Sequence, residues 1–316
     1  MSIYNHSEIF KFGFFLLFVF LKQRGQGDNP LKTIIENIQG RLDEFTRAEK
    51  QLVSQLLDNY PVSGLGSITA LAKKARVSTP TVARMVHKLG YEGFPQFQQA
   101  LRDELGEKIS SPVDRRERWA ENAPDTHVLN RFADAISQNV RGTFAQIDPE
   151  RFDATCELLA DTERAVNIVG GRITRSLADY FFTHLQVIRT QVTYMTSNSN
   201  AWPHYILDMS EGDVLVIFDI RRYENDLLRL AEMTKERGVN IVLFTDQWGS
   251  PISKLAAQKF NSRIEAPSAW DSSVVTMLLL EAIIAGVQER NWGETKERIK
   301  SLDGLFDRTR LFRKFT

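Results

Sequence analysis

The chain has 316 residues, enough for about two domains of roughly 150 residues each. Its 40 Lys and Arg residues balance 40 Asp and Glu residues, so the chain as a whole is no general polyanion binder, and any nucleic-acid site must be local. Cys156 is the only cysteine, which excludes an internal disulfide and a cysteine-cluster metal site. A single thiol fits a reducing setting, and we expect a cytoplasmic protein.

Residues 1–28 are the part of the sequence that least resembles a globular domain. Ile9–Leu21 is strongly apolar, but Lys11 and Gly13 interrupt it, and it is shorter than the roughly 20 residues of a membrane span. No small-residue cleavage site follows, as a signal peptide would need. We expect an apolar, flexible N-terminal extension that is non-native or misassigned, and no membrane partner. A membrane-associating anchor and an extra packing helix are the alternatives.

Two helices are predicted next. Residues 31–42 carry Leu and Ile on one helical face. Thr46 and Glu49 have the spacing of a capping box, so a second helix begins after Thr46, and Asn59–Pro61 ends it. We interpret these helices as a scaffold for the segment that follows.

A pair of short helices is predicted in Gly66–Phe97. Ile68–Ala75 places its apolar residues on one stripe, and a tight turn follows. Ser78 or Thr79 can cap a second helix, and Gly90 ends it. Two short helices joined by a tight turn are the geometry that places the second helix in a DNA major groove.

The charge of this segment supports nucleic-acid binding. No Asp or Glu occurs from Asn59 to Tyr91, whereas several basic residues do. A surface of one sign that faces a polyanion avoids repulsion and gains free energy from counterion release. The structural alternative is two small helices in an ordinary helical domain. The basic residues of the window are Lys73, Lys74, Arg76, Arg84 and Lys88.

Four motifs in this region carry a family resemblance. They are T-x-x-E at Thr46–Glu49, S-x-x-x-L-A at Ser67–Ala72, V-S-x-x-T-V-x-R at Val77–Arg84 and L-G-Y-x-G-F-x-x-F at Leu89–Phe97. In this order and spacing they resemble the N-terminal domain of RpiR/MurR-type bacterial transcriptional regulators. In that family, this domain binds operator DNA, and a C-terminal sugar-isomerase-like (SIS) domain senses a metabolite.

The resemblance implies a helix-turn-helix DNA-binding domain over residues 29–108. Its recognition helix would be Thr79–Leu89. For each hydroxyl in the implied contact set, a helix cap is the structural alternative. The implied DNA-contacting residues are Lys74, Ser78, Thr79, Thr81, Arg84 and Lys88, with the two lysines on the DNA backbone.

Strands and helices alternate after a polar, proline-containing linker at residues 109–126. This alternation predicts an α/β domain over residues 127–316 with a parallel sheet and helices on both faces. Such sheets bind ligands at the carboxyl ends of their strands, where the strand order reverses. The expected strands are 165–169, 191–195, 213–218, 239–244 and 263–266, and the expected helices are 128–144, 174–185, 224–237, 251–258 and 270–289.

The alternation, with Gly170 after the first strand and Gly249–Ile252 after the fourth, resembles the SIS fold. The resemblance implies a flavodoxin-like three-layer sandwich, so the expected fold class is a helical DNA-binding domain followed by an α/β SIS domain. SIS domains bind carbohydrate derivatives, and they pair through apolar helices. Thr276–Ile284 is apolar on nearly all sides. We therefore expect a homodimer or a homotetramer.

Two strand-end loops depart from the SIS pattern. In the family, a G-x-G-x-S turn follows the first strand and an S-x-S-G-x-T loop, which cradles a phosphate, follows the third. In Gly170–Thr174, Arg172 replaces the second glycine and Thr174 keeps a hydroxyl. In Asp219–Glu224, Asp219 and Arg221 stand at the two serine positions, Arg222 at the glycine and Glu224 at the threonine. The implied effector-binding residues are Gly170, Arg172, Thr174, Asp219, Arg221, Arg222 and Glu224.

In place of the lost hydroxyls, three arginines at these strand ends could clamp an anion bidentately. We hypothesise a small anionic effector, phosphosugar-like or carboxylate, held by Arg172, Arg221 and Arg222. The alternative is that Asp219 and Glu224 pair with these arginines and fill the site. Both interpretations remain open from the sequence.

The sequence thus predicts a DNA-binding transcriptional regulator whose SIS domain senses a metabolite. The alternatives are a sugar-phosphate isomerase with an appended helical domain, an SIS domain that only dimerises, and a helical pair that contacts proteins. No nucleophile–base motif and no metal-ligand spacing is apparent, so we expect no enzyme activity, no metal and no cofactor.

Overall fold

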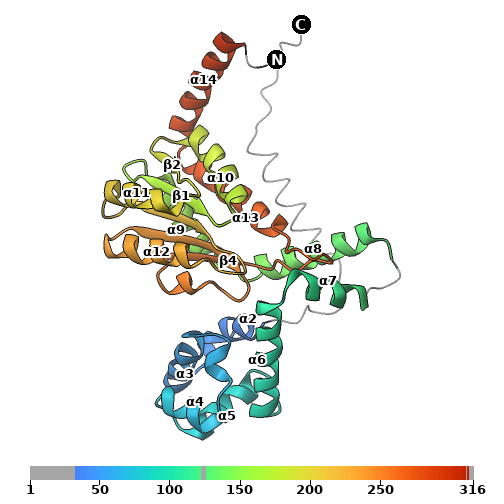
Figure 1. The fold of residues 1–316 in the computed structure, drawn as a ribbon. Helices are drawn as coiled ribbons and strands as arrows, with labels where there is room; N and C mark the ends of the chain where they lie inside the picture. The colour runs from blue at the N-terminus through green and yellow to red at the C-terminus, as the bar shows by residue number, and fades with distance from the viewer. Residues whose placement is uncertain (1–32, 122–125, 311, 313–316) are drawn as a thin grey trace. The chain divides into compact units, whose positions relative to one another are not determined.

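A computed structural model describes residues 33–121, 126–310 and 312, and residues 33–316 form one compact unit (Figure 1). Along this unit, a helical part comes first and an α/β part follows. The predicted extension at residues 1–28 lies outside the described residues. In the described ranges, no helix is both long and apolar enough to cross a membrane.

Side-chain caps begin the first two α-helices of the helical part. Thr33 and Thr46 each accept a hydrogen bond from the backbone N–H of a glutamate three residues later, whose carboxylate accepts one in return. The capping box predicted at Thr46 is confirmed. The first helix begins only after its own cap, Thr33, and is therefore shorter than the predicted 31–42. The elements are α2 (Ile34–Gln39), η1 (Leu42–Glu44), α3 (Arg47–Leu57), η2 (Val62–Gly64), α4 (Ile68–Lys74), α5 (Thr79–Lys88) and α6 (Phe94–Ile109).

The predicted helix pair is present as α4 and α5. Ser78 caps α5 by accepting a hydrogen bond from the backbone N–H of Thr81 at 3.3 Å. Arg76 in the turn has a φ of 52° and Gly90 after α5 has a φ of 93°, both in the left-handed region. The two helices share a core with α3 and α6, so the pair is held rigidly. Its fully buried members include Leu52, Leu56, Leu71, Val82, Met85, Val86, Phe97 and Leu101.

The predicted linker contains a helix, α7 (Pro112–Glu121). Ser111 and Asp114 close its first turn, because each backbone N–H donates to the other residue's side chain. Arg115 on this helix is only 7% exposed. The segment is therefore more ordered than its polar composition indicated.

The α/β part is built on a five-stranded parallel sheet with the strand order β2-β1-β3-β4-β5. This confirms the predicted fold class. The strand order reverses between β1 and β3, which is the switch point at which such sheets bind ligands. The strands are β1 (Val166–Gly170), β2 (Val192–Tyr194), β3 (Val214–Phe218), β4 (Asn240–Asp246) and β5 (Gln258–Ser262). The helices are α8 (Val128–Phe144), α9 (Pro149–Ala160), α10 (Arg175–Ile188), α11 (Trp202–Asp208), α12 (Asn225–Glu236), α13 (Val274–Arg290) and α14 (Trp292–Thr309), with short η3 (Ser199–Ala201) and η4 (Pro251–Lys254).

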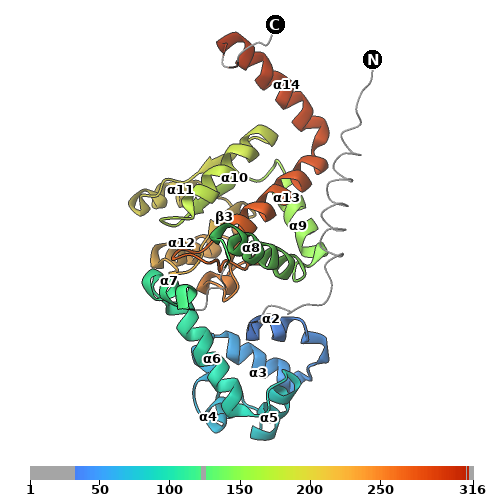
Figure 2. The same ribbon diagram turned by 90° about the vertical axis from the view of Figure 1, so that its right-hand side faces the viewer.

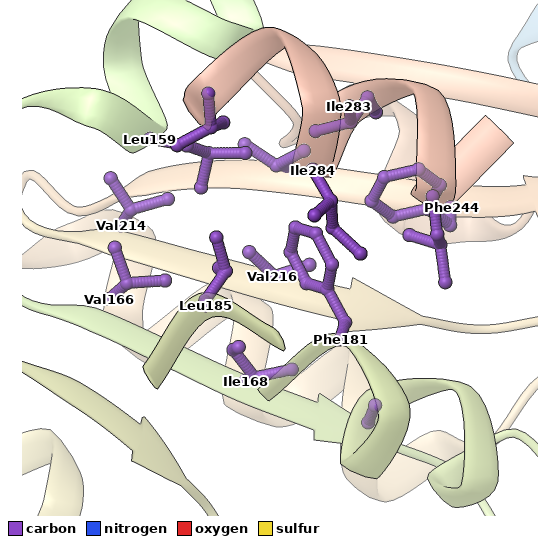
Figure 3. Packing of buried hydrophobic residues seen from close by; sticks show 14 of the residues in the cluster. Leu159, Val166, Ile168, Phe181, Leu185, Val214, Val216, Phe244, Ile283 and Ile284 are labelled. Carbon is purple, nitrogen blue, oxygen red and sulfur yellow. The ribbon is translucent and has the colours of Figure 1, made fainter. Parts of the chain in front are cut away.

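Helices cover both faces of the sheet and make three layers (Figures 1 and 2). On one face, α9, α10 and α13 bury alternate strand residues, so Phe181 and Leu185 of α10 point toward the sheet beneath Ile284 of α13 (Figure 3). On the other face, α11 and α12 cover the strand residues of opposite parity. Every residue of β1 and β3 is buried, so packing on both faces fixes the position of the carboxyl ends of these strands.

Two predictions near the sheet edge are wrong. Residues 251–258 form only the short η4, and the last strand is residues 258–262 instead of 263–266. As an edge strand, β5 carries a single large apolar residue, Phe260, so it gives no apolar run to detect. Ile264 is buried instead against the core of the helical part. Helices α9, α11 and α14 were also not predicted, although Asp148 does cap α9.

A buried ion pair joins the helical part to the α/β part. Arg263, just after β5, donates from Nε and Nη2 to the two carboxylate oxygens of Glu36 on α2 at 2.9 and 2.5 Å. Gln146, just after α8, donates to the same carboxylate at 2.8 Å. A side chain at Gly142 would come within 2.5 Å of the guanidinium, so this glycine leaves room for the pair. The Glu36 and Arg263 side chains are 3% and 9% exposed.

Arg263→Met should destabilise the protein by about 3–5 kcal/mol, because the Glu36 carboxylate would stay buried without its cation. Adding Glu36→Gln removes that charge and keeps a cap acceptor for Thr33, so the double variant should be more stable than Arg263→Met alone. Urea unfolding of both variants measures the difference. Glu297→Gln, in the exposed pair with Lys300, is the control and should change stability by less than about 1 kcal/mol. A loss below about 1 kcal/mol for Arg263→Met would contradict a structural role for the pair.

Candidate functional site

Two of the predicted DNA-contacting hydroxyls are engaged with each other at the start of α5. The Oγ of Ser78 lies 2.9 Å from the Oγ1 of Thr81, and Thr81 is only 7% exposed. Ser78 is exposed and Thr79 is half-buried. The structure therefore gives Ser78 and Thr81 a capping role, and their contact with DNA stays a prediction.

The predicted basic residues differ in their exposure to solvent and in their ion pairs. Lys74 and Arg84 are exposed, as are Lys73 and Arg76, which the predicted site left out. Lys88 instead forms an ion pair with Glu49 at 2.8 Å and donates to the Glu44 carbonyl at 3.1 Å. Lys88 thus ties the end of α5 to the start of α3.

A cavity of about 370 Å³ lies at the carboxyl ends of β1 and β3, at the switch point of the sheet. We call it the strand-end cavity. It brings together every predicted effector-binding residue except Gly170. Its lining residues are Pro112, Arg115, Gly171, Arg172, Ile173, Thr174, Asp219, Ile220, Arg221, Arg222, Glu224, Trp270, Asp271 and Ser273.

Glycine and threonine shape the β1 side of this cavity. Thr174 Oγ1 accepts a hydrogen bond from the Gly171 N–H at 2.8 Å and donates to the Phe218 carbonyl at 2.7 Å, which ties the two strand ends together. A side chain at Gly170 would lie 2.6 Å from the Thr174 carbonyl, so Gly170 permits this close turn without lining the cavity. Both hydrogen bonds of the Thr174 hydroxyl are therefore made to the protein backbone.

In the loop after β3, Arg222 has a backbone conformation that glycine usually adopts. Arg222 has a φ of 60°, which a non-glycine residue adopts only at a cost in free energy. The Glu224 carboxylate reaches across to accept a hydrogen bond from the Arg172 N–H at 2.6 Å. The Arg172 N–H is therefore already hydrogen-bonded to Glu224 and is not free to bind an anion.

Asp219 is buried at the base of the same loop. Its carboxylate accepts hydrogen bonds from the Glu224 N–H, at 3.2 Å, and from the Ser250 hydroxyl. Burial raises the pKa of Asp219 to about 6 despite these two hydrogen bonds. Asp219 makes no ion pair with Arg221 or Arg222, so the predicted pairing within the loop is absent for this residue in the described part of the chain.

The three predicted arginines are in two different environments. The Arg221 side chain is 3% exposed and makes ion pairs with Asp271, at 3.2 Å, and Glu265, at 3.9 Å. Arg172 and Arg222 are exposed, and among the described residues neither side chain has a hydrogen bond or an ion pair. Two arginines are thus available at the cavity, and the third is already paired.

Sequence reasoning missed Arg115 and Asp271 as cavity residues. Arg115, in the predicted linker, donates to the Ala269 carbonyl at 2.9 Å and lies 3.7 Å from Asp271. Trp270 is also at the cavity, where it is 54% exposed. No motif marks these positions, because they reach the cavity from segments that are distant in sequence.

Asp219→Asn should remove a pH dependence of stability. Because the pKa of Asp219 rises from 3.8 to about 6 on folding, the folded state holds a proton that the unfolded state releases, and stability falls as pH rises through this window. The variant should therefore gain about 2–3 kcal/mol on the wild type between pH 3.8 and pH 7. Urea unfolding at several pH values measures this gain. Parallel stability curves for the two proteins would show that Asp219 titrates normally.

Comparison with known proteins identifies both parts of the chain. Two family models match, "Helix-turn-helix domain, rpiR family" over residues 32–108 and "SIS domain" over residues 158–286. The transcriptional regulator HexR of Pseudomonas aeruginosa is 25% identical over 271 residues, which are 82% of this chain and 90% of that protein. HexR of Escherichia coli is 20% identical over 279 residues, 84% of this chain and 92% of that protein.

A solved structure supports the fold of the α/β part. The sugar isomerase domain of an RpiR transcription factor from Sphaerobacter thermophilus matches with a TM-score of 0.52 and 19% identity, covering 55% of this chain and 97% of that one. The order of the two matched domains and the regulators that match along most of the chain agree with each other. The chain is a transcriptional regulator of the RpiR family, with a helix-turn-helix domain followed by an SIS domain.

Proposed function

We propose that this regulator binds operator DNA through α5 and senses a small anionic metabolite in the strand-end cavity. The observation that carries the proposal is the pair of exposed, unpaired arginines at the switch point of the sheet, among the residues that the structure describes. We divide the chain accordingly into a DNA-binding domain at residues 29–108, a helical linker at 109–126 and a sensor domain at 127–316. The N-terminal extension at 1–28 has no assigned part in this function.

The DNA-binding part of the proposal rests on the exposed face of the helix pair. Arg84, near the middle of α5, and Thr79, in its first turn, are accessible to base edges, and Lys74 on α4 is accessible to phosphates. Lys73 and Arg76 add exposed positive charge beside them. Ser78 and Thr81 would contribute by holding the start of α5, and Lys88 by holding its end.

The effector part rests on the charges at the strand-end cavity. Arg172 and Arg222 each carry a planar fork of donors that fits a carboxylate or a phosphate. The cavity volume, about 370 Å³, is within the range of small-molecule sites. Exposed Trp270 and Ile173 add an apolar wall. We therefore favour an anion that also has an apolar or ring portion, and a phosphosugar or a carboxylate both meet this description.

A sensor explains the cavity better than an isomerase does. An isomerase needs a base close to its bound substrate, whereas the carboxylate of Asp219 is engaged by Ser250 and that of Glu224 by the Arg172 N–H. The serine and threonine positions of the family's phosphate loop hold Asp219, Arg221 and Glu224. We propose that the chain has no enzyme activity of its own.

We also propose a cytoplasmic homodimer, or a tetramer built from it. Helix α13 buries one side in the core, whereas on its other side Val274 is exposed and Leu278 is only half-buried. Apolar residues on such a face favour pairing with a second copy of the chain. Two copies of α5 related by a twofold axis would match a palindromic operator.

Arg84→Ala should weaken binding to the DNA upstream of the gene by roughly 10- to 100-fold, because a base-reading or phosphate-binding arginine is lost from the centre of α5. Electrophoretic mobility shifts at 50 and 200 mM salt measure it, and wild-type affinity should fall steeply between the two. Arg229→Ala, on the exposed face of α12, is the control and should bind as the wild type does. Equal affinity of all three proteins would contradict a DNA-reading role for α5.

The double variant Arg172→Gln/Arg222→Gln should lose anion binding. Inorganic phosphate, a hexose phosphate and citrate serve as probes in thermal unfolding, since a ligand at a hundred times its Kd stabilises by about 2.7 kcal/mol. At least one probe should raise the Tm of the wild type and of Arg175→Gln, which removes an exposed arginine outside the cavity. A Tm rise that persists in the double variant would place anion binding elsewhere.

A further inference from the structure

The loop that lines the strand-end cavity also contacts the DNA-binding domain. Arg222 presents its side chain to solvent at the cavity, whereas the neighbouring Arg221 is buried. The backbone N–H of Arg221 donates to Asp246 at 2.7 Å, which ties the loop to the end of β4. Two adjacent arginines of one loop therefore face two different parts of the protein.

The Arg221 guanidinium ends at the carboxyl terminus of α6. Its Nη1 donates to the Glu107 carbonyl at 3.0 Å and to the Ser110 hydroxyl at 3.3 Å. The last carbonyls of a helix lack intrahelical partners and carry partial negative charge, so a cation there is favourable. The guanidinium also lies over the ring of Trp248 at 4.3 Å. Asp271 and Glu265 complete its surroundings.

Helix α6 connects this contact to the DNA-reading helix. Phe97 and Leu101 in its first half are fully buried in the same core as Met85 and Val86 of α5. A helix packed in this way moves as a unit with its neighbour. A shift at the end of α6 would therefore be passed to the exposed face of α5.

We propose that Arg221 is a latch that holds the end of α6 and that an anionic effector releases. This inference rests on the proposed function. The guanidinium lines the strand-end cavity, and its Nε and Nη2 have no hydrogen-bond partner among the described residues, so an anion bound by Arg172 and Arg222 can accept from these donors and compete with the Glu107 carbonyl for Nη1. An anion is a stronger acceptor than a main-chain carbonyl. Binding of the effector thus favours a state in which α6 is no longer held, and this difference between states is what couples the two sites.

Hydrogen exchange of the full chain tests the latch without any effector. Arg221→Gln imitates the released state, and Arg175→Gln removes an equal charge from an exposed arginine outside the cavity. Exchange of the amides in residues 105–118 should rise at least tenfold in Arg221→Gln and stay within twofold of the wild type in Arg175→Gln. Arg221→Lys, which keeps the charge but loses the fork of donors, should fall between the two and guards against a folding defect in Arg221→Gln. Unchanged exchange in Arg221→Gln would overturn the latch.

Operator binding tests the coupling on the same proteins. With the upstream DNA as probe, Arg221→Gln should differ from the wild type in Kd by at least fivefold, and Arg175→Gln should not. If exchange rises but the Kd is unchanged, the contact exists and its regulatory role is overturned. If the wild type binds no DNA, the proposed function fails, whereas the exchange result still decides whether Arg221 holds α6.

Discussion

Two buried guanidinium groups of the SIS domain find acceptors on the helix-turn-helix domain, and these contacts connect the two domains. Arg263 is matched by the carboxylate of Glu36, and Arg221 by the Glu107 carbonyl in the last turn of α6 and by the Ser110 hydroxyl. A buried charge without a partner costs several kcal/mol, so each domain is stabilised by the presence of the other. The same contacts tie the helices of the helix-turn-helix domain to the strand ends of the SIS domain.

The strand-end loops show how a fold can keep its backbone while its binding chemistry changes. The loop after β3 retains a left-handed residue at the position of the family's glycine, although that residue is Arg222. Its hydroxyl positions are occupied by Asp219, Arg221 and Glu224, which hold the loop together or hold α6. We infer that an anion-binding site remains at the switch point, made by side chains of arginine in place of hydroxyls and backbone amides.

The sequence was sufficient for features that local chemistry determines. The capping box at Thr46, the cap at Ser78 and the span of α8 follow from nearby residues. The edge strand β5 was misplaced, because its single buried Phe260 leaves no pattern. Six of the seven predicted effector residues do line one cavity. What the sequence could not reveal was the partner of each charge: Arg221 contacts a helix end 114 residues away, and no spacing rule predicts such a pair.

Calorimetric unfolding of the full chain tests most directly whether buried charges unite the two domains. If Arg263 and Arg221 depend on acceptors in the DNA-binding domain, the two domains should unfold in one transition, with a calorimetric enthalpy equal to the van't Hoff enthalpy. Two separate transitions, with the DNA-binding domain melting while the sensor domain keeps its full stability, would contradict this account.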